Sequence, residues 1–429
     1  MNKSIQLIFV AIVLIATNTI AQQEKGIVGS SNWLNNWTDF KPGKSEGNET
    51  NSILVGNISS NTTLTKNNTY LLQGNVYVIN NSTLTIEAGT VIKGDFETTG
   101  TLIITKGSTI NAIGKETDPI VFTSNKSPKK AGDWGGIVIF GEAQVNKFGG
   151  VASLNFELEP TRNVYGGTNA QSNSGSMQFV RIEFAGKKSK GFDYCNGLTL
   201  CGVGNKTSLS NIMCSFSGND SFAIFGGDLK ANKLISLKAN DDDFEVTQGA
   251  QFVLDNSIAI RNSYISSPKS FPRCLELNAY VKKEDTDFSK KPTSIIASNV
   301  IFLNDSKELA AEIGMGLVKE SIFVSEGTLL SFKKSVLNGF KPAVILDKSI
   351  ETKPENFKKI KFEEMFFNNC TGNVFAENEL NNEDIEDYYG QLSLSNVFDQ
   401  KSNEDIYLDF KNPKTPDYRI QLSKITAQK

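Results

Sequence analysis

Histidine is absent from all 429 residues of the sequence. Its absence excludes Ser-His-Asp triads, Cys-His dyads and the HExxH metalloproteases, because each of these uses an imidazole as base or metal ligand. Histidine-ligated zinc is excluded for the same reason. No other exclusion that the sequence provides is as strong.

Cysteine is scarce, and its spacing argues against a metal role. The five cysteines contain no C-x-x-C pair, so a thiolate zinc site is not expected. An odd number of thiols cannot pair completely within one chain. Cys195 and Cys201 could bridge a turn, or the cysteines could be buried as free, small hydrophobic residues.

A basic excess is also missing. Lys and Arg number 44 against 47 Asp and Glu, and no basic patch is visible, so a nucleic-acid partner is not expected.

Long apolar runs are missing except at the start of the chain. Residues 7–16 are apolar, follow Lys3 and precede the small residue Ala21. This pattern predicts a secretory signal peptide over residues 1–21, since its apolar core is too short for a spanning helix of about 20 residues. The mature chain then has no transmembrane segment. Residues 22–52 form a polar lead-in, whose Trp33 and Trp37 we expect to dock on the first coil of the fold.

Two acidic turns repeat along the chain, and they indicate the fold. Residues 219–222 and 241–244 lie 22 residues apart, and each opens a short strand. An earlier segment, residues 198–202, has the same shape. Repetition at this period, with strands and tight turns in place of helical patterns, is typical of a β-solenoid.

A second similarity appears nearer the N-terminus. Residues 83–92 align with residues 101–110 at an offset of 18, with alternating apolar residues and a glycine at the same place. The alignment predicts that Leu84 stacks on Leu102, and that Ile86 stacks on Ile104, in adjacent coils. We therefore expect an all-β fold, a single right-handed parallel β-helix over residues 53–350. Residues 146–176 and 282–292 should loop out of it, and residues 351–429 should form the last coils and a partly helical cap.

Several short sequence motifs resemble those of a known family. They include LTIEAGTVIK at 84–93, GDWGG at 132–136, VRIEFAG at 180–186, DSFAIFGG at 220–227 and DDDF at 241–244. Over residues 53–350 the chain resembles secreted right-handed parallel β-helix proteins of Bacteroidetes, many of which are cargo of the type IX export system. The resemblance implies export to the cell envelope, the cell surface or the medium.

The acidic turns are also the first candidate site. Asp220, Asp241, Asp242 and Asp243 could lie within one coil spacing of each other, where like charges are unfavourable. A calcium ion with oxygen ligands would relieve that repulsion. The alternative is that aspartates stand at these corners because they tolerate left-handed backbone and accept hydrogen bonds from nearby amides.

A second hypothesis is enzymatic. Parallel β-helices include lyases and hydrolases that act on acidic polysaccharides, and a lyase could use calcium on the aspartates with Arg261 or Arg273 as base or charge stabiliser. The alternative is that both arginines pair with surface acids, which contributes little free energy.

Trp134 is the third candidate. Together with Trp33, Trp37 and Tyr165 it could form a surface that stacks on a sugar or contacts a protein. The alternative, which we favour, is that Trp134 packs a corner of the coil.

The function expected from these observations is non-enzymatic. Stacked coils make long, regular faces, so we expect a binding or scaffold surface at the cell envelope, as an accessory subunit of an outer-membrane protein complex. The alternative is a calcium-dependent polysaccharide lyase or a glycan-binding protein.

Overall fold

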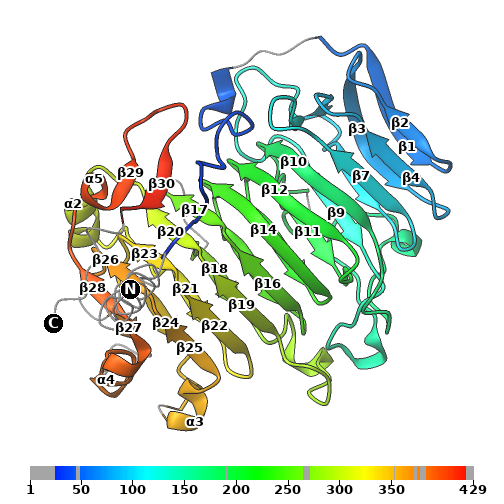
Figure 1. Ribbon diagram of the computed structural model, residues 1–429. Helices are drawn as coiled ribbons and strands as arrows, with labels where there is room; N and C mark the ends of the chain where they lie inside the picture. Colours follow the sequence, from blue (N-terminus) through cyan, green and yellow to red (C-terminus); the bar gives the residue numbers. More distant parts are fainter. Residues whose placement is uncertain are drawn as a thin grey trace, which may run out of the picture.

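A computed structural model describes residues 25–44, 49–189, 191–263, 271–351, 353–371, 374–376 and 383–421. The expected signal peptide lies outside these residues. Strands of successive coils pair in parallel and build three long sheets around one apolar core, so the predicted parallel β-helix is confirmed (Figure 1).

The first sheet follows one side of the coil. Its strands, in order of pairing, are β2 (Thr62–Leu64), β4 (Thr83–Ile86), β7 (Thr109–Ile113), β10 (Gly175–Glu183), β12 (Ser208–Ser215), β14 (Asp228–Leu237), β16 (Gln251–Asp255), β19 (Ser294–Ser298), β22 (Leu329–Lys333) and β25 (Ile360–Glu363).

The second sheet starts at the N-terminal end of the solenoid and shares the long strands of the middle coils. It contains β1 (Ser52–Ile58), β3 (Thr69–Val78), β5 (Val91–Gly94), β8 (Ile120–Ser124), the ends of β10, β12 and β14, then β17 (Ile258–Arg261), β20 (Ile301–Asn304), β23 (Val336–Asn338), β26 (Phe366–Asn368) and β28 (Val397–Asp399).

The third sheet closes the coil and carries the acidic turns. It runs from the end of β3 through β6 (Thr101–Ile104), β9 (Gly136–Phe140), β11 (Leu198–Cys201), β13 (Phe222–Phe225), β15 (Phe244–Thr247), β18 (Leu275–Leu277), β21 (Ile322–Val324), β24 (Val344–Leu346) and β27 (Phe375–Ala376).

Helices are short and lie in the connections. They are η1 (Pro42–Lys44), η2 (Phe148–Gly150), η3 (Pro160–Arg162), η4 (Lys283–Asp285), α2 (Leu309–Gly314), α3 (Pro354–Phe357), α4 (Glu383–Tyr389), η5 (Leu392–Leu394) and α5 (Asn403–Ile406). An antiparallel hairpin, β29 (Tyr407–Asp409) and β30 (Asp417–Ile420), ends the described chain. The structure thus confirms both expected excursions, the short helices of the C-terminal region and the continuation of parallel coils past residue 350.

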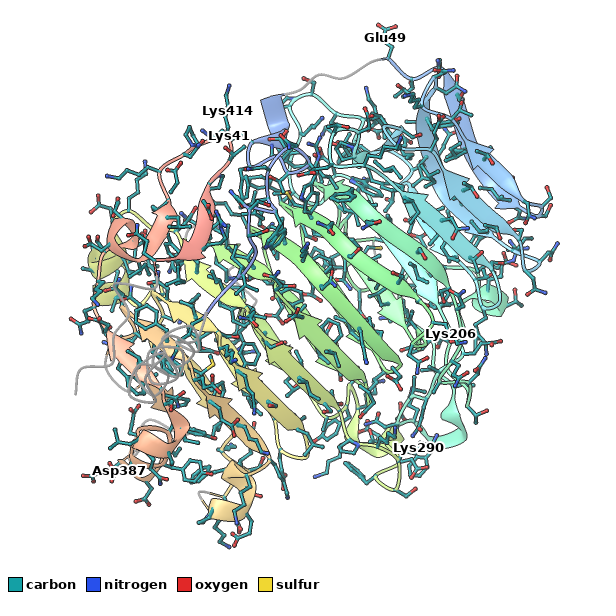
Figure 2. All side chains as sticks on the ribbon, in the orientation of Figure 1. Lys41, Glu49, Lys206, Lys290, Asp387 and Lys414 are labelled. Atoms are coloured by element: carbon teal, nitrogen blue, oxygen red, sulfur yellow. The ribbon has the colours of Figure 1, made fainter. Side chains whose placement is uncertain are left out.

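Figure 2 shows charged side chains such as Lys206, Lys290 and Asp387 at the periphery of the ribbon. No helix among the described residues is long and apolar enough to cross a membrane.

The register of the coils confirms one predicted repeat and corrects the other. Phe222 pairs with Phe244, so the 22-residue offset of the acidic turns is a true coil repeat. The 18-residue offset is wrong, because Leu84 pairs with Ile110 on the first sheet, whereas Leu102 pairs with Val76 and Ile137 on the third. Segments 83–86 and 101–104 are two sides of one coil, and they look alike because both alternate inward and outward residues.

One corner of the coil repeats a left-handed backbone conformation. Between the first and second sheets, a single residue with positive φ turns the chain in consecutive coils: Phe179, Asn211, Lys233, Asn256, Asn299, Lys334 and Glu364. Asparagine occupies three of these seven positions, which fits its tolerance of this region of backbone space. The abundance of asparagine in the sequence therefore partly reflects the corner geometry.

The polar lead-in packs along this same corner. Gly26 N donates to Lys334 O (2.7 Å), Val28 N to Asn256 Oδ1 (2.9 Å), and the Trp37 ring meets the Phe179 ring edge-on at 5.8 Å. The lead-in therefore crosses the middle and late coils (Figure 1), and the expected docking of its tryptophans on the first coil is wrong. Its apolar residues pack with the C-terminal hairpin over the outer side of the second sheet, where they cover Ile235, Ile258 and other side chains.

The cysteines are free thiols, and Cys195, Cys201, Cys214 and Cys274 are buried. A bridge between Cys195 and Cys201 is therefore not formed. Burial raises the pKa of the Cys195 thiol to about 12, which keeps it protonated and unreactive.

Stacked phenylalanines form the centre of the core. The Phe302 ring lies 6.3 Å from that of Phe244 and 5.6 Å from that of Phe332, and all three side chains are fully buried.

Phe302→Ala should lower the free energy of unfolding by about 3–5 kcal/mol, because it removes buried apolar surface and leaves a cavity. Urea denaturation measures the change. The exposed Phe148, when replaced by Ala, should change stability by less than about 0.5 kcal/mol; equal losses in both variants would contradict the assignment of the core.

Candidate functional site

The acidic turns stack at the starts of β13, β15 and β18. Asp220 Oδ1 accepts a hydrogen bond from Asp242 N (3.1 Å), and Asp242 Oδ1 accepts one from Arg273 N (2.7 Å). Each side chain therefore extends the ladder between coils, and the expectation that these aspartates accept bonds from backbone amides is confirmed for these two. The expected left-handed backbone is not observed, since none of the four aspartates has a positive φ.

Three of the four aspartates come together. Ligand oxygens of Asp220, Asp241 and Asp242 lie within 4.8 Å of one another. Asp243 does not join them. It is fully buried and turned to the other side of the chain, where it accepts bonds from Arg261 Nη1 (2.9 Å) and from Ser236. Asp243 is therefore removed from the predicted metal-ligating set.

Two glutamates that the sequence reasoning missed complete the cluster. Glu245 lies within hydrogen-bonding reach of Asp220, from the neighbouring strand, and the charge of Glu276 acts on both Glu245 and Asp242. Alternation could have found them, because Phe244 and Val246 point into the core and place Glu245 outside. Its partner one coil further is Glu276.

Burial and mutual repulsion disfavour the charged forms of this cluster. Burial, with the negative charge of Glu276, raises the pKa of Glu245 from 4.5 to about 7. Burial and neighbouring carboxylates also raise the pKa of Asp220 and of Asp242 well above the usual range. These carboxyls therefore bind protons more tightly than isolated ones, and a bound cation would compete with the protons.

The two arginines are held in place by several partners. Arg261 Nη1 donates to Asp241 O (2.8 Å), Asp243 Oδ2 (2.9 Å) and Arg273 O (2.9 Å), and its side chain is buried. Arg273 lies between Glu320 (2.7 Å) and Glu276 (3.1 Å). The expectation that Arg261 and Arg273 pair with surface acids is therefore wrong for Arg261, whose partner is a buried carboxylate. The guanidinium group of Arg261 thus supports the turn at Asp241 and Asp243, and that of Arg273 is held by two glutamates.

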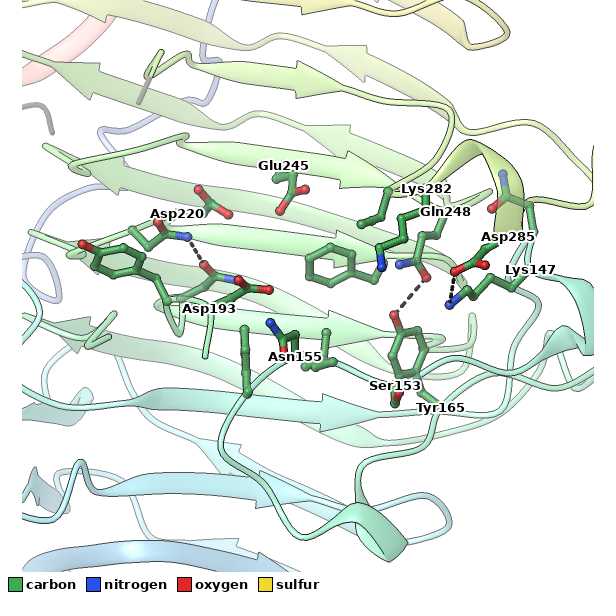
Figure 3. Close-up of a pocket in the computed structure, with 18 of the residues that line it drawn as sticks. Lys147, Ser153, Asn155, Tyr165, Asp193, Asp220, Glu245, Gln248, Lys282 and Asp285 are labelled. Carbon is green, nitrogen blue, oxygen red and sulfur yellow. Dashed lines mark hydrogen bonds and ion pairs between the residues drawn. The ribbon is translucent and has the colours of Figure 1, made fainter. Parts of the chain in front are cut away.

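A groove runs beside the cluster on the outer side of the third sheet. Its volume is about 730 Å³, and Asp220, Glu245 and Gln248 lie along the strands that form its floor. Figure 3 shows Glu245 beside Asp220, and it shows the ion pair between Lys147 and Asp285 further along the lining. This ion pair measures 3.1 Å. Further residues of the lining were also missed by sequence reasoning, because they come from distant excursions: Asn155, Lys188, Asp193, Tyr194 and Lys282.

A family model described as a pectate-lyase-like β-helix domain matches residues 56–405. The chain belongs to the pectate-lyase-like β-helix family. No curated protein and no solved structure matches it. The match extends past residue 350, in agreement with the parallel coils that continue to β28. The predicted parallel β-helix family is thus confirmed, whereas a bacterial source and export remain predictions.

In this pectate-lyase-like chain the third predicted site residue, Trp134, belongs to the core. Its ring stacks on Phe122 at 6.4 Å, and its indole Nε1 donates to Glu183 O at 2.8 Å. Gly94 is required beside it, since a Cβ there would lie 2.4 Å from the ring. Trp33, Trp37 and Tyr165 are also buried. The hypothesis of an aromatic binding surface at these residues is wrong, and the packing alternative is confirmed.

The raised pKa of Glu245 predicts a pH dependence of stability. Because its carboxyl binds a proton more tightly in the folded chain than in the unfolded one, stability should rise as pH falls from about 7 to about 4.5. The expected gain is roughly 1–3 kcal/mol without divalent cations. Urea denaturation across this range measures it, and Glu245→Gln should flatten the curve. Stability that falls steadily over the same window would contradict the repulsion.

Proposed function

We propose that this protein binds an acidic polysaccharide along the groove of the third sheet and does not cleave it. The observation that carries the proposal is the composition of the groove. Asp220 and Glu245 lie on its floor, Lys188 and Lys282 line it, and Lys147 lines it in an ion pair with Asp285. Lysines offer ion pairs to the carboxylates of a polymer, and the groove has the volume of a ligand site.

Calcium fits the acidic end of the groove. Three carboxylates with oxygens within 4.8 Å supply hard ligands, and the backbone amides of Asp242 and Arg273 orient the carboxylates of Asp220 and Asp242. When bound, calcium would neutralise Asp220, Asp241 and Asp242 and could also accept a carboxylate of the polysaccharide. Two kinds of contact hold these three aspartates in place. They are the hydrogen bonds from backbone amides of the next coil to Asp220 and Asp242, and the bond from Arg261 to Asp241 O.

A binding role is favoured over cleavage because the groups that would take part in a lyase reaction are already engaged. Arg261 is buried against Asp243, and Arg273 is paired with two glutamates. A general base must be able to reach the proton that it removes. Neither guanidinium group is available for this, because each is already held by carboxylate partners. The sequence contains no histidine that could replace them.

The setting that suits this role is the cell envelope or the surroundings of the cell. The apolar run at residues 7–16 supports export, and acidic polysaccharides are extracellular polymers. The protein would then act as an exported, elongated binding surface.

Calcium titration and polymer binding test the proposal. At about 100 times its Kd, calcium should stabilise the protein by about 2.7 kcal/mol and raise the Tm. Binding to polygalacturonate, followed by affinity electrophoresis, should require calcium and release no unsaturated products. Asp242→Asn, which keeps an amide oxygen for Arg273 N, should lose the calcium effect, whereas Asp287→Asn on the exposed excursion should not. Unsaturated ends detected by ultraviolet absorbance would refute the non-enzymatic role, and a lack of binding to polygalacturonate or alginate would refute the ligand class.

A protein companion is a second candidate, favoured by the first coil. Strand β1 pairs with β3, no described strand pairs with its other edge, and its outward Ile53 and Val55 are 63% and 65% exposed. An open strand edge with apolar side chains is a template for a strand from another protein, such as an outer-membrane subunit.

Affinity purification of the tagged protein from native membranes tests the companion. A stoichiometric partner should remain bound to the wild type and should be lost from Val55→Lys, since a charge on the edge strand opposes pairing. The matched control is Ile296→Lys, an exposed aliphatic residue on the first sheet. A partner retained equally by both variants would place the contact elsewhere.

A further inference from the structure

A second hollow lies beyond the groove, behind a shared wall. The excursion between β18 and β19 forms this wall, and its residues alternate between the two sides. Val281 and Lys282 line the groove, whereas Tyr280 and Lys283 line the second hollow, which measures about 610 Å³. The two spaces are therefore neighbours along the solenoid axis.

Loop length explains the second hollow. At one corner of the coil, the connection between β21 and β22 is a short turn at residues 325–328, while the connections before and after it, residues 278–293 and 347–359, are long. The short turn therefore becomes the floor of a trough between two raised loops. Ser325 and Thr328 come from the floor, and Asn356 comes from α3 on the far side.

The wall is held firmly from the side of the groove. Asp287 N donates to Asn146 O (2.8 Å), Asn146 Nδ2 donates to Ala279 O (2.7 Å), and Lys290 Nζ donates to Lys147 O (2.8 Å). These bonds fix the excursion against the loop that follows β9. Its other flank, which carries two aromatic rings, faces the second hollow.

Phe288 of the aromatic pair is exposed, unlike most large rings of this chain, and Tyr280 is partly buried. Phe288 is 63% exposed, and its ring meets that of Tyr280 edge-on at 6.0 Å. Leu329, partly exposed, lines the same hollow. The rest of the lining is polar, with hydroxyl and amide groups from Ser325, Thr328, Ser349 and Asn356 and charged groups from Lys283, Glu326, Glu351 and Lys359. Apolar ring faces beside short polar groups suit a sugar ring, which presents a C–H face and a rim of hydroxyls.

We propose that the second hollow is a further subsite for the same polysaccharide, with Phe288 and Tyr280 as its stacking platform. This inference rests on the proposed function of the groove and adds to it that the ligand is a long chain. From β13 to β21 the third sheet advances three strands, or about 14 Å along the axis. A polymer bound in both spaces must span this distance and cross the wall, so short oligomers would occupy the groove alone.

Calorimetric titration with polygalacturonate oligomers of two lengths, a trimer and a dodecamer, tests the subsite in the presence of calcium. The wild type should bind the dodecamer more tightly than the trimer. Phe288→Ala and Tyr280→Ala should each weaken dodecamer binding about fivefold, because a stacking contact is lost, and should leave the trimer Kd within about twofold. The matched control is Phe148→Ala, since Phe148 is 64% exposed but lines neither hollow.

The outcomes separate the subsite from the groove. If the wild type binds the dodecamer and Phe288→Ala binds it equally well, the subsite is refuted and the groove stands. If Phe288→Ala weakens trimer and dodecamer alike, the ring acts on the groove through the wall, and the subsite is again refuted. If the wild type binds neither oligomer, both the groove proposal and this inference fail. An unchanged Tm for each variant confirms that folding is not the cause of a loss.

Discussion

Register between coils is the constraint on which the rest of this structure depends. Every strand of the three long sheets pairs in parallel with its equivalent one coil away, so any residue of these sheets repeats its neighbourhood about every 4.8 Å along the axis. A charge at one position is therefore placed directly against whatever occupies that position in the next coil. In the column that passes through Asp220, Asp242, Arg273 and Glu320, two acids are followed by a base and then an acid. The chain places an arginine at one end of the column and leaves the carboxyls at the other end without a basic side chain between them.

The two ends of that column have different chemistry as a result. Around Arg273 and Arg261 the charges are satisfied by ion pairs and by backbone carbonyls, so this part is a structural support. Around Asp220 and Glu245 burial raises the pKa of both carboxyls, and no arginine compensates for them. Removing one partner of a buried pair costs several kcal/mol, so the supporting end is expected to tolerate substitution poorly. The groove lies beside the uncompensated end, where an added cation would gain the most.

The sequence predicts this architecture better than it predicts the site, for physical reasons that differ between residues. The turns at Asp220 and Asp242 could be aligned because they lie one coil apart, and no long excursion interrupts the chain between β13 and β15. The alignment of Leu84 with Leu102 was wrong because every side of a coil has the same local pattern. Each side alternates inward and outward residues and ends in a tight corner. Glu245 was predictable from alternation within its own strand. The pairing of Arg273 with Glu320 was not, because it joins residues 47 apart across coils whose connections vary in length. Packing was the favoured interpretation of Trp134, but no local pattern reveals its partners on β8 and β10.

The lead-in that lies along the left-handed corner changes how the solenoid should behave as a polymer of coils. A stack in which each coil touches only its neighbours behaves as a one-dimensional chain and can fray from either end. Here Lys25 donates to Met365 O and to Ser395 O near one end, and Trp37 contacts Phe179 several coils away. The lead-in therefore connects coils that are not neighbours. Such long-range coupling suppresses independent melting of the terminal coils and makes unfolding more cooperative. It also means that the first described residues find their final partners only after the last coils have formed.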